Sequence, residues 1–191
     1  MKKILSTLGV CLIAGGVFAQ GTVNFNNRVT ASGVSAPVFN TDGTTGLDSS
    51  FVAQLWWDNG GTWEVAPFGT EPNEGQIPFR DGAGAGFMNP TGFDTTRAFA
   101  SVAPGGNVTL QIRAWEGTYS TYVEAAGTQG ALIGTSADLT IATGGVGSPP
   151  GLAADMVGLQ SFNMTMVPVP EPSVIMLGIA GAGLLWFRRK K

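Results

Sequence analysis

The side chains that could do chemistry in this sequence are carboxylates and tryptophans. There is no histidine, and the single cysteine, Cys11, lies in an apolar run at the N-terminus. Ser-His catalysis, Cys-His catalysis and a Cys/His metal site are therefore excluded between Gln20 and Pro168. Two carboxylates could still form a glycosidase pair. Most of them, however, lie in Gly- and Asn-rich turns, so we expect a solvated acidic surface with no enzyme activity, no cofactor and no metal site.

Aromatic rings offer a second chemistry, the stacking of sugars. Trp56, Trp63 and Trp115 are the candidate carbohydrate contacts, because flat indole rings present large apolar faces. Trp56 and Trp57 are neighbours in a predicted strand and must point to opposite faces of the sheet. If one face is core, the other Trp is exposed or covers a second layer. Packing is the commoner role of Trp in strands, and both interpretations stay open.

Charge is distributed unevenly along the chain. The formal net charge is −3, but Lys2, Lys3 and four C-terminal cations supply six of the ten basic residues. Between Gln20 and Pro168 there are four Arg, no Lys and twelve Asp or Glu, a formal charge of −8. Because a phosphate backbone is bound through basic contacts, we expect no nucleic-acid partner.

Two segments carry apolar residues at every second position, as strands with one buried face do. They are Phe51–Trp57 and Asn107–Trp115. Their apolar faces contain Phe51, Ala53, Leu55 and Trp57 in the first and Val108, Leu110, Ile112 and Ala114 in the second. Asp58-Asn59-Gly60-Gly61 follows the first segment and predicts a hairpin that returns through Thr62–Val65.

Shorter strands are predicted elsewhere, and no segment between Gln20 and Pro168 has convincing helical periodicity. Residues 120–126 are the one candidate for a short helical turn. The additional strands are expected within residues 21–29, 37–39, 77–80, 85–88, 96–102, 136–143 and 159–167. Many short strands separated by turns predict an all-β domain over residues 20–168. We expect an antiparallel β-sandwich, of jelly-roll or immunoglobulin-like type, flanked by a signal helix and a C-terminal hydrophobic helix.

The N-terminus has the pattern of a secretory signal peptide over residues 1–19. Lys2 and Lys3 precede an apolar run, and Val17-Phe18-Ala19 places small residues at the positions required before a cut. We expect cleavage between Ala19 and Gln20. The alternative is an uncleaved membrane helix.

The C-terminal segment, residues 169–191, contains three different parts. Pro170-Glu171-Pro172 is held extended by its prolines. The 14 apolar residues of Val174–Phe187 follow; as a helix they would span about 21 Å, less than the roughly 30 Å of a bilayer's hydrocarbon core. Four cations end the chain and favour the cytoplasmic side of a membrane: Arg188, Arg189, Lys190 and Lys191.

This segment resembles the PEP-CTERM sorting signal, which has a Pro-Glu-Pro motif, a short apolar helix with small residues and an Arg-rich end. The resemblance implies that Pro170, Glu171 and Pro172 are a sorting motif, near which a membrane enzyme called exosortase cuts the tail. Carriers occur in Gram-negative bacteria that make extracellular polysaccharide. The central region more loosely resembles the β-rich middle of other such proteins, and that resemblance implies no activity. An ordinary membrane anchor is the alternative interpretation.

We therefore expect an exported protein that is held transiently at the inner membrane. After processing it would reside in the cell envelope, on the outer surface or in the extracellular matrix. A structural role is the first hypothesis. A carbohydrate-binding module for extracellular polysaccharide is the second.

Overall fold

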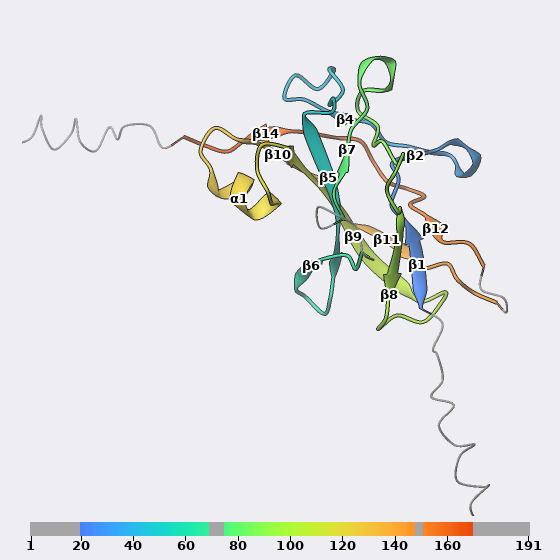
Figure 1. Ribbon diagram of the computed structural model, residues 1–191. Helices are drawn as coiled ribbons and strands as arrows, with labels where there is room; N and C mark the ends of the chain where they lie inside the picture. The colour runs from blue at the N-terminus through green and yellow to red at the C-terminus, as the bar shows by residue number, and fades with distance from the viewer. Residues whose placement is uncertain (1–19, 69–74, 148–150, 170–191) are drawn as a thin grey trace, which may run out of the picture.

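The computed structural model describes residues 20–68, 75–147 and 151–169 (Figure 1). Several predictions fall on residues outside these ranges. They are the signal peptide of residues 1–19 with its cut after Ala19, the Pro170-Glu171-Pro172 motif, the apolar run of residues 174–187, and the basic end at Arg188, Arg189, Lys190 and Lys191.

The described chain is mostly β-strand, with one short α-helix, so the all-β prediction is confirmed. The strands are β1 (Gly21–Asn24), β2 (Arg28–Val29), β3 (Val34–Ser35), β4 (Val38–Phe39), β5 (Phe51–Asp58), β6 (Trp63–Val65), β7 (Ile77–Pro78), β8 (Thr96–Phe99), β9 (Asn107–Glu116), β10 (Leu132–Thr135), β11 (Leu139–Ala142), β12 (Ala154–Asp155), β13 (Phe162–Asn163) and β14 (Thr165–Met166). The helical elements are η1 (Thr30–Ser32), η3 (Gly82–Gly84) and α1 (Tyr122–Gly127).

The largest sheet has seven strands, in the order β14-β10-β9-β5-β6, with β11 paired to β9 and β7 paired to β5. All its pairs are antiparallel. Strands β5 and β9 form its centre over a long register that runs from Phe51 opposite Glu116 to Trp57 opposite Leu110.

Burial along β5 and β9 follows the predicted alternation except at Gln54 and Trp115, which lie on the other face of each strand but are also buried. The apolar face of each strand is buried, whereas Val52 and Trp56 of β5 are only half-buried. Trp57 belongs to the core and Trp56 does not, as the opposite directions of neighbouring strand residues require. The hairpin after β5 is also confirmed, since Asp58 lies opposite Trp63. Its turn has Gly60 and Gly61 at φ of 68° and 94°, a region that favours glycine.

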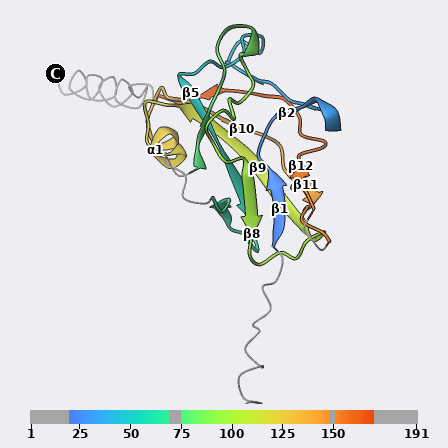
Figure 2. The same ribbon diagram turned by 45° about the vertical axis from the view of Figure 1, so that its right-hand side comes forward.

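A smaller sheet, in the order β12-β1-β8, lies beside the large one (Figure 1, Figure 2). Apolar residues of both sheets belong to one core cluster, including Val23 of β1 and Phe99 of β8. The rings of Trp57 and Phe99 meet across the two sheets at 5.1 Å. Two further sheets have two strands each, β13-β4 and β2-β3.

Two polar side chains are fully buried in the fold and join distant segments. Asn27 donates to the carbonyl oxygens of Ala36 and Gly86 and accepts from the amide of Met88, each at 2.9 Å. Arg97 of β8 donates to the carbonyl oxygens of Asp94 at 2.6 Å and Gly75 at 3.1 Å. These side-chain bonds satisfy buried polar groups and add to the backbone hydrogen bonds that hold the same loops, such as the one from the Ala36 amide to the Asn27 carbonyl oxygen at 3.0 Å.

Several predicted strand boundaries are wrong. Residues 21–29 form two strands because the chain turns after Asn24, and residues 159–167 divide between β13 and β14, which pair with different strands. Residues 85–88 form no strand and contribute a single bridge, between Phe79 and Met88. Strand β10 was not predicted.

The described chain has no helix that is long and apolar enough to cross a membrane. Its one α-helix, α1, has 6 residues.

Candidate ligand-binding surface

The outer face of the large sheet gathers residues from β5, β6 and β9. Trp56 and Asp58 alternate away from the core, and Trp63 lies opposite Asp58 across the hairpin. Arg113 of β9 lies opposite Gln54, on the same outer face. Two of the predicted carbohydrate contacts, Trp56 and Trp63, are thus brought to one face by the register of the sheet.

Helix α1 adds Tyr122 to this face. Two side chains cap its N-terminus: the Thr121 hydroxyl accepts from the Glu124 amide at 3.1 Å, and the Glu124 carboxylate accepts from the Ser120 amide at 2.9 Å. The Tyr122 hydroxyl lies 2.9 Å from that of Thr135 on β10. Both ends of the tyrosine side chain are therefore fixed over the sheet.

Arg113 is the centre of the group that we call the aromatic–arginine cluster, formed by Trp56, Trp63, Arg113 and Tyr122. The Cζ atom of Arg113 lies 4.0 Å from the Trp56 ring centroid, 5.2 Å from that of Tyr122 and 5.8 Å from that of Trp63. The rings of Trp56 and Tyr122 meet edge to face at 6.2 Å. All four side chains are half-buried, so the cluster is ordered but still in contact with solvent.

The polar partner of Arg113 is uncharged. Its Nε and Nη2 atoms donate to Gln111 Oε1 at 3.4 and 3.2 Å. The amide of Gln111 is oriented by Asp138, which accepts from Gln111 Nε2 at 2.7 Å. No carboxylate among the described residues pairs with Arg113 directly. Burial lowers the pKa of Arg113 below its ordinary value, with a smaller opposing effect of Tyr122.

Trp115, the third predicted carbohydrate contact, does not belong to this open surface. It lies on the outer face, as its position in β9 predicts, but its exposed fraction is 0%. The Tyr122 ring packs against it at 5.9 Å, and its Nε1 donates to the carbonyl oxygen of Tyr119 at 3.0 Å. Because the α1 segment covers Trp115, its ring cannot stack on a sugar in this structure.

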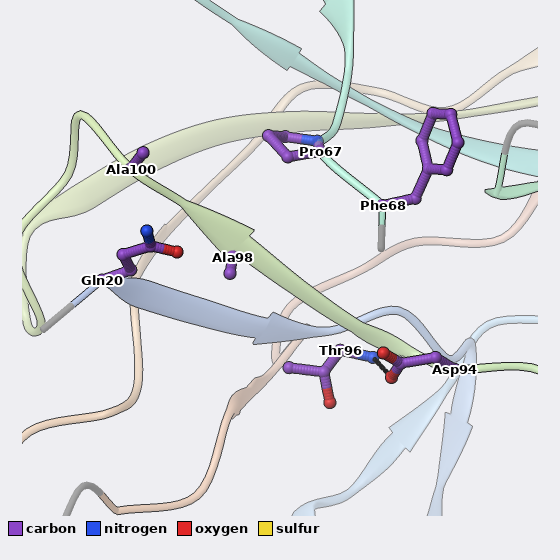
Figure 3. Close-up of a pocket in the computed structure, with 7 residues that line it drawn as sticks. All are labelled: Gln20, Pro67, Phe68, Asp94, Thr96, Ala98 and Ala100. Carbon is purple, nitrogen blue, oxygen red and sulfur yellow. Dashed lines mark hydrogen bonds between the residues drawn. The ribbon is translucent and has the colours of Figure 1, made fainter. Parts of the chain in front are cut away.

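A groove of about 410 Å³ lies at a different place, along β8 (Figure 3). Thr96 and Ala98 of β8 line one side, and Pro67 and Phe68 lie across from them. Asp94 is engaged with the Thr96 amide at 2.8 Å. The remaining lining residues are Gln20 and Ala100. With one carboxylate and mostly small side chains, the groove presents no pair of catalytic groups among its lining residues.

The carboxylates of the described chain are dispersed. No group of three or more potential metal ligands occurs among the described residues. Asp42 accepts hydrogen bonds from the Thr45 hydroxyl and from the Thr44 and Thr45 amides, which lower its pKa to about 2. A bond from the Ser50 hydroxyl likewise lowers the pKa of Asp48. Both stay ionised and stabilise turns, which is the opposite of what a proton donor at neutral pH requires.

Sequence reasoning considered Tyr122, together with the tryptophans, as part of a sugar-stacking surface, but it missed Arg113 as a member of the site. Arg113 could be placed on the outer face of its strand, but its cross-strand neighbours depend on the register. The signal for α1 was present as Thr121 followed three residues later by Glu124.

Comparison with known proteins adds no relative: no family model matches the chain, and no curated protein or solved structure matches it significantly. The resemblance of the C-terminal segment to a sorting signal therefore depends on its own residues.

Proposed function

We propose that the protein is an exported domain whose C-terminal segment is a PEP-CTERM-type sorting signal, cut by an exosortase-like enzyme near Pro170-Glu171-Pro172. The observation that carries this proposal is the order of three parts at residues 170–191: the motif, the short apolar run and the basic end. The released domain would serve a structural role in the cell envelope or extracellular matrix. The acidic, lysine-free domain of residues 20–168 then acts as cargo.

The end of the fold supports this organisation. Val167 pairs with the segment before β10, since its carbonyl oxygen accepts from the Gly130 amide at 3.0 Å and its amide donates to the Ala131 carbonyl at 2.8 Å. These hydrogen bonds end three residues before Pro170. A processing enzyme that cuts near the motif would thus leave the backbone hydrogen bonds between the strands of the domain intact.

We further propose that the domain is an antiparallel β-sandwich of jelly-roll or immunoglobulin-like type, with the seven-stranded and three-stranded sheets as its layers. The Trp57–Phe99 contact and the shared core support this arrangement.

Deletion of residues 170–191 tests the sorting proposal. In a host with an exosortase, we expect the deletion to move the protein from the membrane and surface fractions to the soluble exported fraction. Replacing Arg188, Arg189, Lys190 and Lys191 by Gln should leave uncut precursor, because the tail loses its cytoplasmic anchor. Unchanged fractionation and unchanged mature mass would contradict the proposal.

A second proposed function is carbohydrate binding by the aromatic–arginine cluster. What supports it is the gathering of half-exposed Trp56 and Trp63 around Arg113 on one sheet face, where rings can stack on sugars. The substitution Trp63→Ala, which removes one of these rings, should abolish retention of the full chain on polysaccharide during affinity electrophoresis. Phe87→Ala is the matched control, because Phe87 is also half-buried and lies under an arginine, Arg28, at 4.7 Å. Equal retention of both variants would exclude the cluster as the carbohydrate-binding site.

A further inference from the structure

We propose that the aromatic–arginine cluster binds an acidic sugar, with the carboxylate of a uronic acid on Arg113 and the sugar ring on Trp63. This inference rests on the carbohydrate-binding function proposed above and names its substrate class.

Arg113 has hydrogen-bonding capacity that the fold leaves open. A guanidinium carries five N–H donors in a planar fork. In the described structure the Arg113 donors reach one acceptor, the neutral Oε1 of Gln111. The Nη1 group has no hydrogen-bond partner among the described residues. A carboxylate matches this fork and would form charge-assisted hydrogen bonds with it.

The acidic side chains near the cluster are engaged with other donors. Asp138 holds Gln111, and Glu124 holds the Ser120 amide. Asp58, which lies opposite Trp63 on the same outer face, accepts from the Gly61 amide at 2.6 Å. None of them neutralises the half-buried guanidinium, which is therefore the complementary group for an anion from outside.

The rings around Arg113 select a sugar over a simple anion. One face of Trp56 is occupied by the guanidinium at 4.0 Å, whereas Trp63 is farther away, at 5.8 Å from Cζ. A pyranose on Trp63 would place a ring carboxylate within reach of Arg113. The net charge of −8 in residues 20–168 opposes binding of a dense polyanion at long range, but at 0.15 M salt charges beyond about 8 Å are largely screened.

Titration calorimetry of the full chain in detergent at 0.15 M salt tests this assignment. The probes are a galacturonic acid hexamer and the same hexamer with every carboxylate methyl-esterified. We expect the acid to bind at least tenfold more tightly than the ester. Arg113→Gln should remove this preference while the affinity for the ester changes less than twofold. Arg28→Gln, which removes an arginine stacked on Phe87 elsewhere, should keep the preference.

The outcomes separate the two proposals. Equal binding of acid and ester by the wild-type protein would overturn the acidic-sugar assignment and leave carbohydrate binding intact. Binding of neither hexamer would contradict both. A hexaglutamate peptide that binds as tightly as the acid hexamer would also overturn the assignment, because it carries the charge without sugar rings. Arg113→Lys should recover at most part of the preference, since an ammonium lacks the planar fork.

Discussion

Arg97 and Arg113 both lie among aromatic rings, but the fold uses them differently. Arg97 is 1% exposed, lies 5.4 Å from the Phe25 ring and donates to backbone carbonyl oxygens of Asp94 and Gly75. Arg113 is half-buried on the outer face and donates to one neutral side chain. The comparison teaches that proximity to aromatic rings alone does not identify a site. Exposure together with open donor capacity makes Arg113 the candidate.

The largest effect is expected at Trp115, which lies in the same strand as Arg113 but is buried. Trp115→Ala should lower the free energy of unfolding by about 4 kcal/mol, because it empties the space under α1 and frees the carbonyl of Tyr119. Denaturant unfolding of the full chain measures this. Trp63→Ala serves as control and should cost less than about 1 kcal/mol. Similar losses for the two variants would remove the distinction between the covered and open parts of this face.

Replacing each arginine by methionine addresses the comparison itself. Arg97→Met should cost about 3 kcal/mol, because buried carbonyl oxygens lose their donors. Arg113→Met should cost about 1 kcal/mol, since an apolar side chain can still pack on Trp56 and the losses are the cation–π attraction and two long hydrogen bonds to Gln111. Urea unfolding of the two variants and of the wild-type protein measures both free-energy changes. A larger loss for Arg113 than for Arg97 would make Arg113 the structural residue of the two.

The smallest effect is expected at Asp42, in the turn between β4 and β5 and away from both arginines. Its folded pKa of about 2 lies below the ordinary value of 3.8, so its stabilisation is complete above about pH 4 and is lost as the pH falls towards 2. Asp42→Asn should flatten the dependence of stability on pH across this interval. Thr45→Val, which removes the hydroxyl donor, should shift the carboxyl pKa back towards 3.8. An unchanged acid profile in both variants would show that the turn makes no such contribution.

The sequence predicted the centre of the fold because β5 and β9 alternate over long segments. Trp56 and Trp57 were correctly divided between the two faces for the same reason. Strand β10 was not predicted because Gly134 interrupts its alternation of apolar and polar residues. A Cβ there would come within 2.8 Å of the Met164 sulfur, so the glycine allows close packing of a segment distant in sequence.

The candidate site was only half predictable. Trp56 and Trp63 share a hairpin, which a local signal specifies. Arg113 reaches them through the pairing of β5 with β9, which no local pattern specifies. Trp115 was placed on the correct face but not in the correct environment, because its burial depends on a six-residue helix that packs over it.

The most direct test of the difference between the two arginines is an NMR titration of the full chain in detergent with the galacturonic acid hexamer. The signals are the side-chain N–H groups of the arginines and tryptophans. We expect the Arg113 Nε and Trp63 Nε1 resonances to shift with saturation, while those of Arg97 and Trp57 stay unchanged. Shifts at Arg97 and Trp57, or no shift at Arg113 and Trp63, would contradict the account.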